Sequence, residues 1–328
     1  MLRSFALLVL AFIVILIGVP SLIVSSWRGD VVPPDEEIPN PTINLYVTSS
    51  KQIVSLPLED YVKGVVAAEM PASFESAALE AQAVAARTYA ARRARGLGGN
   101  GCDSHPLADL CDNPAHCQAW LPTAELQTKW GMIDYQTYWT KISQAVKATA
   151  GQILTYQGVA IDPLFHSTCG GHTEDAGAVW QMSLPYLVPV ECGYCQHSPK
   201  YQADQRYSLD AFLSAVRRLD GSIAVTASEF SGSSRPLSIS AKTATGRAAE
   251  VALGGKEIKA TSLRYALGLN STRFTFESDG EQIVFHVTGY GHGVGLCQYG
   301  ADGMARKGYN YRQILAHYYQ GTLITTLR

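Results

Sequence analysis

Glu69 is the residue whose setting most suggests acid catalysis. It ends an apolar stretch within the run VVAAEMP (65–71). A carboxyl group among apolar neighbours loses solvation of its charged form, so we expect the pKa of Glu69 to be raised. A carboxyl that keeps its proton near neutral pH can serve as a general acid. The alternative is a solvent-exposed glutamate at a helix end, and the local pattern leaves both interpretations open.

Cysteine and histidine residues form two sets whose spacing predicts metal binding. Tetrahedral zinc takes four thiolate or imidazole ligands, which often come from short loops. The first set has one residue more than four and predicts a structural zinc site, with Cys102 as the least expected ligand; the alternative is a Cys111–Cys117 disulfide. Its members are Cys102, His105, Cys111, His116 and Cys117.

The second set is spread along the chain and contains only cysteines: Cys169, Cys192, Cys195 and Cys297. The C-x-x-C pair is a good two-ligand chelate, and two glycine-rich loops could bring the other thiols to it. We rank a second metal site first. The alternatives are a Cys192–Cys195 redox pair or a Cys169–Cys297 disulfide. The total of seven cysteines is odd, so intrachain disulfides cannot pair all of them.

Two glycine-rich loops follow expected strands, FHSTCGGH (165–172) and GYGHGVGLCQYG (289–300). Glycine permits close approach of a backbone to a ligand, and loops at strand ends often carry binding residues. Such loops suit a polysaccharide groove. The glycine spacing matches neither phosphate-binding pattern, and no lysine follows it. The net charge of only −2 gives no basic excess for nucleic acid, so we expect no nucleic-acid partner.

The elements that must carry these residues predict an α+β fold. Residues 5–24 form an apolar run of about 20 positions, long enough for a transmembrane helix, so 1–24 is expected to be an uncleaved anchor. The proline-rich segment 25–42 resembles a linker. Residues 43–328 then form one large domain outside the cytoplasm, with a β-rich subdomain near 208–288. A cleaved signal peptide is the alternative to the anchor.

Periodicity predicts several elements within 43–328, and their mixed order favours α+β over a parallel βαβ sheet. Helices are expected at 57–70, 74–95, 135–150, 208–219 and 311–319. Strands are expected at 43–47, 53–56, 151–156 and 159–165, with short β-hairpins between 222 and 288.

Five motifs, in order along the chain, resemble the stage II sporulation protein D (SpoIID) family of lytic transglycosylases. They occupy residues 58–71, 77–90, 111–118, 166–174 and 291–301, and the likeness extends from about residue 43 to the end. Many relatives have serine at Cys169 and Cys297 and lack the Cys192–Cys195 pair.

The resemblance implies cleavage of peptidoglycan glycan strands between N-acetylmuramic acid and N-acetylglucosamine, preferably in strands without stem peptides. Glu69 matches the catalytic glutamate, which protonates the glycosidic oxygen and then deprotonates the muramic 6-hydroxyl to give a 1,6-anhydro product. One carboxyl group suffices, unlike the pair of ordinary glycosidases. The zinc site maps onto His105, Cys111, His116 and Cys117, with Cys102 as a possible extra ligand.

The resemblance also implies a cell-membrane protein that works during sporulation with an amidase (SpoIIP-like) and a membrane partner (SpoIIM-like). Two other functions are considered: a non-catalytic glycan-binding enhancer of an N-acetylmuramoyl-L-alanine amidase, and a zinc hydrolase. The hydrolase is disfavoured because no H-E-x-x-H motif is present. The motifs and the two loops together predict these substrate-binding residues: Gln82, Arg87, His166, Ser167, Gly170, Gly171, His292, Gln298 and Tyr299.

Overall fold

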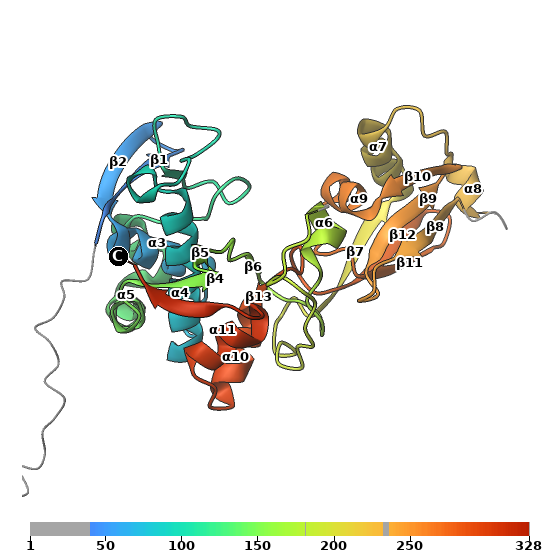
Figure 1. Ribbon diagram of the computed structural model, residues 1–328. Helices are drawn as coiled ribbons and strands as arrows, with labels where there is room; N and C mark the ends of the chain where they lie inside the picture. Colours follow the sequence, from blue (N-terminus) through green and yellow to red (C-terminus); the bar gives the residue numbers. More distant parts are fainter. Residues whose placement is uncertain (1–39, 181, 232–235, 328) are drawn as a thin grey trace, which may run out of the picture. The chain divides into compact units, whose positions relative to one another are not determined.

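The computed structural model describes residues 40–328, except for 181, 232–235 and 328 (Figure 1). The expected anchor 1–24 and almost all of the linker 25–42 lie outside these residues. No helix within the described part of the chain combines the length and the apolar character needed to span a bilayer. Helices and strands are mixed in sequence, which confirms the α+β class.

The helices of the described residues are α3 (Leu58–Glu69), α4 (Ser76–Arg93), the 3₁₀ turn η2 (Arg95–Leu97), α5 (Thr123–Ala148), α6 (Ala176–Trp180), α7 (Leu209–Leu219), α8 (Ala227–Ser231), α9 (Ala260–Leu267), α10 (Gln298–Arg306) and α11 (Tyr311–Tyr318). The strands are β1 (Thr42–Val47), β2 (Gln52–Pro57), β3 (Leu110–Cys111), β4 (Gln152–Tyr156), β5 (Val159–Ala160), β6 (Phe165–His166), β7 (Gln202–Ser208), β8 (Leu237–Lys242), β9 (Ala248–Leu253), β10 (Lys256–Lys259), β11 (Phe274–Ser278), β12 (Gln282–Thr288), β13 (Leu296–Cys297) and β14 (Leu323–Thr326).

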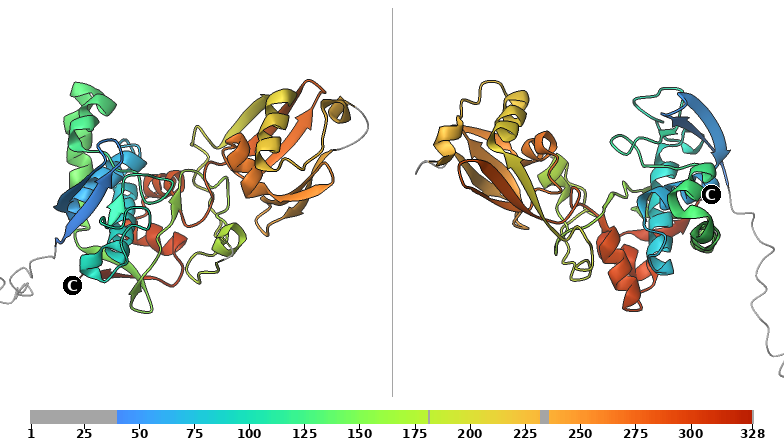
Figure 2. Two further views of the ribbon diagram at one scale, coloured as in Figure 1. Left: turned by 90° about the horizontal axis from the view of Figure 1, so that it is seen from above. Right: turned by 180° about the vertical axis from the view of Figure 1, so that it is seen from behind.

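The main core forms around α4, which is buried along most of its length. Its many alanines leave little side chain between its backbone and its neighbours, so other elements can pack against it closely. α3, α5, α10, α11 and β4 all contact it. Figures 1 and 2 show α10 and α11, from the end of the chain, beside this early helix. The core therefore joins residues 58–93 directly to residues 298–318.

Residues 202–288 form a second structural layer with its own hydrophobic core. Two three-stranded sheets, β11-β12-β7 and β10-β9-β8, are covered by α7 and α9, which contact each other and the sheets. The buried residues of α7 recur at helical spacing, as in an amphipathic helix. These elements occupy the region in which we expected a β-rich subdomain, although its first strand begins earlier, at Gln202.

Two short parallel strands, one before and one after residues 202–288, bring the two glycine-rich loops together. β6 pairs with β13, with Phe165 opposite Leu296 and His166 opposite Cys297. The backbone of the first loop also bonds to that of the second, because Thr168 and Tyr290 exchange N–H···O bonds of 3.0 and 2.8 Å. The loops that the sequence placed more than a hundred residues apart thus form one structural unit.

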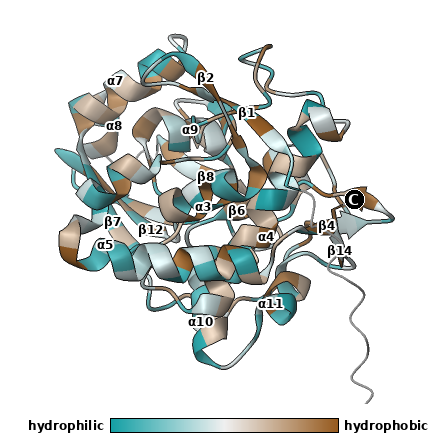
Figure 3. Ribbon diagram, turned by 90° about the vertical axis from the view of Figure 1, so that its left-hand side faces the viewer, coloured by the Kyte–Doolittle hydropathy of each residue, from teal (hydrophilic) through white to brown (hydrophobic). Residues whose placement is uncertain are grey.

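Two expected elements differ from the structure, and the helix α10 is an addition to those expected. The helix expected at 135–150 begins at Thr123, as α5, and changes direction at Gly131, whose φ of 73° lies outside the helical region. Hydrophobic and hydrophilic residues alternate along α5 (Figure 3), which weakened its periodic signal. The strand expected at 159–165 is two short strands, β5 and β6, with Pro163 between them, where a ladder hydrogen bond cannot form. α10 was not expected at all.

We expect Arg87→Met to lower the free energy of unfolding by about 1–3 kcal/mol, because it leaves the partly buried carboxylate of Glu59 without its cation. Arg87 is fully buried and binds Glu59 through two charge-assisted bonds of 2.6 and 2.7 Å. Urea denaturation measures the change. Lys63→Met is the matched control, because it breaks the more exposed Lys63–Asp60 pair on α3, the helix that also carries Glu59. It should cost less than about 1 kcal/mol. Equal effects of the two variants would contradict the prediction.

Candidate active site and metal sites

Glu69 is the last residue of α3 and is only partly exposed. The helix ends there because Pro71 follows Met70, which takes an extended conformation. The backbone N–H of Ala119 donates to Glu69 Oε1 at 2.9 Å. Burial raises the pKa of Glu69, while the Ala119 N–H and the charge of Lys129 partly oppose that rise. The environment of the carboxyl group is thus the one expected of a general acid.

Lys129 of α5 is a neighbour of Glu69 that the sequence did not reveal. Its Nζ donates to the carbonyl oxygens of Ala67 at 2.7 Å and Ala68 at 3.3 Å, at the C-terminal end of α3. A cation there complements the free carbonyls of the helix end. Its charge also favours the ionised form of Glu69. Sixty residues separate the two side chains, so no local pattern could have paired them.

Lys129→Met is expected to shift the high-pH limb of any Glu69-dependent activity to higher pH. The lysine lowers the pKa of Glu69, so its removal should raise that pKa and keep the carboxyl protonated further up the pH scale. A pH–rate profile measures the shift. Lys141→Met is a suitable control, since Lys141 lies on the same helix and its Nζ donates to the Ser73 carbonyl, at 3.4 Å, instead of to the end of α3. A limb that moves to lower pH would contradict the assignment.

The first metal set converges around His116. Its Nδ1 lies 3.5 Å from the Sγ of Cys102, 3.5 Å from that of Cys111 and 3.4 Å from that of Cys117. Zinc bonded tetrahedrally to one imidazole and three thiolates would place nitrogen and sulfur about 3.5 Å apart. All four ligand atoms lie within 4.8 Å of one another. The residues present therefore fit a closed, structural zinc site.

The structure places Cys102 within the observed cluster around His116 and His105 outside that cluster. The His105 ring is stacked on Tyr46 of β1, with centroids 3.7 Å apart and planes at 13°. Cys102 and His105 are paired in an isolated β-bridge, yet Cys102 Sγ lies beside His116 Nδ1 while the His105 ring lies on Tyr46. The ligand ranking that we drew from spacing and from the resemblance differs here from the observed geometry.

The chain segment from Cys117 to Ala119 links the first metal set to Glu69. Cys117 precedes Gln118 and Ala119, whose N–H holds Glu69. Gln118 is buried, and its Oε1 accepts a hydrogen bond of 3.3 Å from the hydroxyl of Tyr61. Tyr61 lies on the same helix as Glu69. A metal bound by Cys111, His116 and Cys117 would fix the start of this segment and hence the donor to the carboxylate.

The joined glycine loops present two histidines and a tryptophan. The rings of His166 and His292 lie 5.5 Å apart, and the Trp180 ring lies 5.0 Å from His292. Trp180 is 43% exposed. Burial lowers the pKa of His292 to about 4 and that of His166 well below its usual value. Both rings are therefore expected to be neutral at physiological pH.

The hydrogen bonds of these histidines define their tautomers. Nε2–H of His292 donates to the Phe165 carbonyl at 2.9 Å, and its Nδ1 accepts the Val294 N–H at 3.1 Å. Nδ1–H of His166 donates to the Val294 carbonyl at 3.1 Å. Nε2 of His166 has no partner among the described residues. It is a buried acceptor that a ligand hydroxyl could satisfy.

The other expected substrate-binding residues have different environments. Gln298, at the start of α10, donates to buried Gln82 of α4 at 3.4 Å. Tyr299 packs edge-on against Phe74, five residues beyond Glu69, with centroids 4.9 Å apart. Arg87 is committed to Glu59 and to backbone carbonyls inside the protein, which favours a packing role over contact with a ligand.

The remaining three lie in the first loop. Ser167 accepts the Tyr299 N–H through its carbonyl at 3.0 Å, so it fixes the start of α10. Gly170 and Gly171 have φ values of 74° and 113°, which side chains rarely adopt. The Gly170 carbonyl accepts Arg273 Nη1 at 2.9 Å. These glycines shape the loop, and their peptide groups rather than side chains are what they can offer a ligand.

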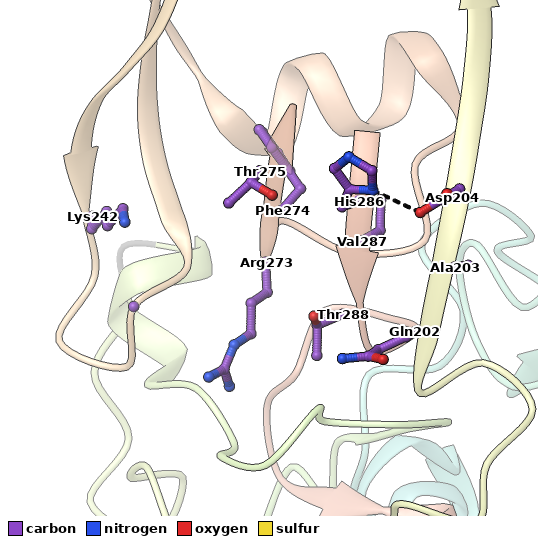
Figure 4. A pocket seen from close by; sticks show the side chains of 11 residues that line it. Gln202, Ala203, Asp204, Lys242, Arg273, Phe274, Thr275, His286, Val287 and Thr288 are labelled. Carbon is purple, nitrogen blue, oxygen red and sulfur yellow. Dashed lines mark hydrogen bonds and ion pairs between the residues drawn. The ribbon is translucent and has the colours of Figure 1, made fainter. Parts of the chain in front are cut away.

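A separate pocket of about 470 Å³ lies on the sheet β11-β12-β7 (Figure 4). It is lined by residues 202–204, 242, 246, 273–275 and 286–288. His286 lies within it, with Nδ1 2.7 Å from Asp204 Oδ1, and Arg273 extends toward its rim. Its lining contains neither Glu69 nor the glycine loops. We therefore place the candidate active site at Glu69 and not in this pocket.

Comparison with known proteins identifies the family of this chain. A family model described as "Stage II sporulation protein" matches residues 46–156, which include Glu69 and the first metal set. The chain is 39% identical over 285 residues to stage II sporulation protein D of Bacillus subtilis (strain 168), covering 87% of this chain and 79% of that protein. The chain belongs to the SpoIID family.

Two further relatives extend this result. Stage II sporulation protein D of Bacillus amyloliquefaciens is 36% identical over 284 residues, covering 87% of this chain and 78% of that protein. The amidase enhancer of Bacillus subtilis (strain 168) is 29% identical over 310 residues, covering 81% of this chain and 40% of that protein. The family resemblance drawn from the five motifs is thus confirmed.

The sequence did not reveal that Trp180, Lys129 and the Ala119 N–H lie beside the candidate site residues. Lys129 and Ala119 reach Glu69 only through tertiary contacts. Trp180 carried one usable signal: it is a large aromatic residue in a segment without strong periodicity, and such residues are frequent in carbohydrate and protein binding surfaces.

Proposed function

We propose that this protein is a peptidoglycan lytic transglycosylase in which Glu69 is the acid and base. The observation that carries the proposal is the setting of Glu69, partly buried at the end of an apolar helix, with a raised pKa and a backbone donor on its carboxylate. A protonated carboxyl of this kind can transfer its proton to a glycosidic oxygen. Membership of the SpoIID family supports action on the cell wall.

The reaction would proceed in two proton transfers at one carboxyl group. Glu69 donates its proton to the glycosidic oxygen as the bond from C1 of N-acetylmuramic acid to that oxygen breaks. The resulting carboxylate takes the proton of the muramic 6-hydroxyl, whose oxygen bonds to C1 and closes the 1,6-anhydro ring. Glu69 ends protonated, and no water is consumed. The Ala119 N–H and the charge of Lys129 stabilise the transient carboxylate.

The glycan strand would bind across the loops that carry His166, His292 and Gln298. The unpartnered Nε2 of His166 would accept a sugar hydroxyl or acetamide N–H. The exposed ring of Trp180 offers a flat apolar face to a pyranose. Binding by neutral groups fits glycan strands without charged stem peptides. We propose that these loops and side chains together form the glycan-binding groove.

The relatives named stage II sporulation protein D support a role in sporulation. We place this protein in the cell membrane with residues 43–328 outside the cytoplasm, where peptidoglycan lies. The first metal set would hold a structural zinc ion, since four protein ligands leave no open position for chemistry. The relative named amidase enhancer supports an amidase as a partner, with a SpoIIP-like amidase and a SpoIIM-like membrane protein as the specific candidates.

Product analysis tests the proposal. A fragment of residues 40–328 is suitable, because it forms one compact unit and keeps the bonds from Pro41 and Asn40 to the start of α3. It would be incubated with glycan strands lacking stem peptides, and the products analysed by mass spectrometry. Anhydro-muramic ends support a lytic transglycosylase. New reducing ends, which contain added water, would instead show a hydrolase.

A second function is favoured by the amidase-enhancer relative: glycan binding that stimulates an amidase without cleavage. Under that alternative, the fragment would bind the strands, form no new ends, and raise the rate of an added amidase. The two functions differ in whether Glu69 is required, because binding alone needs no carboxyl of raised pKa.

A further inference from the structure

The four cysteines outside the first metal set form a second buried cluster. Cys169 follows β6, Cys192 and Cys195 lie in the loop before β7, and Cys297 ends β13. Each is fully buried, and the four sulfur atoms all lie within 4.8 Å of one another. Three chain segments, up to 128 residues apart, therefore bring their thiols to a single point.

The spacing of the sulfur atoms suits a tetrahedral ion. Four thiolates at the usual zinc–sulfur distance of about 2.3 Å have sulfur atoms about 3.8 Å apart. Cys169 Sγ and Cys195 Sγ lie 3.5 Å apart. A pair of disulfides would instead divide the cluster into two bonded couples of about 2.0 Å each. The four sulfur atoms thus form one cluster and are not divided into two bonded pairs.

Several hydrogen-bond donors point at the sulfur atoms. The backbone N–H groups of Cys169 and Gly300 donate to Cys297 Sγ at 3.2 and 3.3 Å. The hydroxyl of buried Tyr318 lies 3.2 Å from Cys192 Sγ. Donors around the ligand atoms are typical of metal sites, where they orient thiolates and offset their negative charge.

A buried cation lies beside the same cluster. Arg247 is 1% exposed and donates from Nη2 to the carbonyl of Cys169 at 2.6 Å. Its Nε and Nη1 have no hydrogen-bond partner within the described residues, and its ion pair to Glu174 is long, at 3.9 Å. A buried charge needs compensation. The buried carboxylate of Glu174 supplies part of that compensation, and a zinc ion with four thiolates, of net charge −2, would add negative charge beside the guanidinium.

Two glycines of α10 make room for the C-x-x-C loop. A Cβ atom at Gly300 would lie 2.6 Å from Cys192 Sγ, and it would also collide with the Tyr318 hydroxyl. A Cβ atom at Gly303 would collide with the carbonyl of Tyr194. These residues are one helical turn apart, so they form a single flat face against which Cys192–Cys195 packs.

We propose that Cys169, Cys192, Cys195 and Cys297 bind a second structural zinc ion through four thiolates. The seven cysteines and His116 then divide into two complete four-ligand sets. The site ties the loop that carries His166 to the loop before β7 and to the start of α10. It has no open position, so it stabilises the arrangement of these loops and takes no part in bond cleavage.

Metal analysis of the full chain tests this inference. The chain would be purified in detergent and reductant without added zinc, and its zinc measured by mass spectrometry against protein concentration. We expect about two zinc ions per wild-type chain and about one in either Cys195→Ser or Cys117→Ser. Each variant controls for the other, because the lost ligands belong to different sets. One zinc ion in the wild type, unchanged by Cys195→Ser, would overturn the proposal.

A measurement on the wild type covers the case in which Cys195→Ser does not fold. Alkylation of the native chain followed by peptide mapping reports which thiols react. We expect Cys169, Cys192, Cys195 and Cys297 to resist alkylation until a strong chelator is added, and then to react together with release of zinc. Equal reactivity with and without chelator, disulfide-linked peptides within the set, or iron in place of zinc would each overturn the assignment.

Discussion

Glu69→Gln is expected to lower the rate of anhydro-muramic product formation by about 10²–10⁴-fold, the usual contribution of a positioned general acid and base. Glutamine retains an oxygen for the Ala119 N–H, which Glu69 accepts at 2.9 Å, so the loop should stay in place. What it lacks is the transferable proton. Initial rates of product release from stripped glycan strands, read by mass spectrometry, measure the loss.

The same variant makes a prediction about stability. Because burial raises the folded-state pKa of Glu69, the folded protein binds its proton more tightly than the unfolded chain, and stability falls as pH rises through that folded pKa. Glu69→Gln removes this loss. We expect its thermal midpoint, relative to wild type, to increase between acidic and mildly alkaline pH, so inactivity would not reflect unfolding.

Glu75→Gln is the matched control for both measurements. It is an exposed carboxylate six positions further on, at the N-terminus of α4, and its side chain makes no capping bond. Its activity and its pH-dependent stability should match wild type. Product formation by Glu69→Gln at the wild-type rate would eliminate the catalytic role of Glu69 and favour the amidase-enhancer function.

Cys102→Ala is expected to remove one zinc ion, whereas His105→Ala should leave the zinc content unchanged. The reason is geometric: Cys102 Sγ is 3.5 Å from His116 Nδ1, and the ring of His105 is stacked on Tyr46 instead. Loss of the ion should also loosen the segment from Cys117 to Ala119. A displacement of about 1 Å at a catalytic group can cost about 100-fold in rate, so we expect a loss of that order in Cys102→Ala.

Zinc content and product formation should therefore both fall in Cys102→Ala and both remain at the wild-type level in His105→Ala. The two residues belong to one turn, so the pair of variants separates ligand loss from general disturbance of the loop. Loss of zinc in His105→Ala with retention in Cys102→Ala would show that the four ligands are those implied by the family pattern.

Short-range patterns were sufficient for much of this protein. The helices predicted at 57–70 and 74–95 correspond to α3 and α4, and the proline after Met70 predicted where α3 ends. The apolar run before Glu69 predicted the raised pKa of its carboxyl group. These features depend on neighbours within one or two helical turns, and a linear sequence states those neighbours directly.

Two helices, α5 and α10, were predicted less well, because contacts with residues distant in the sequence determine them. α5 was predicted only in its second half because Gly131 interrupts it and apolar residues such as Met132 and Ile133 remain exposed. α10 was missed because it is short and glycine-rich, and its Gly300 and Gly303 are explained only by the loop that packs on them. Packing, and not local propensity, decides such elements.

The composition of the chain specified which groups could do chemistry: one carboxyl group in an apolar setting, seven thiols and two glycine-rich loops. Tertiary contacts decided how they combine. They placed Cys102 instead of His105 beside His116, set Lys129 and the Ala119 N–H against Glu69, and turned Arg87 inward to Glu59. Each of these pairings joins segments brought together only by burial of the shared core, and spacing along a chain carries no direct record of such contacts.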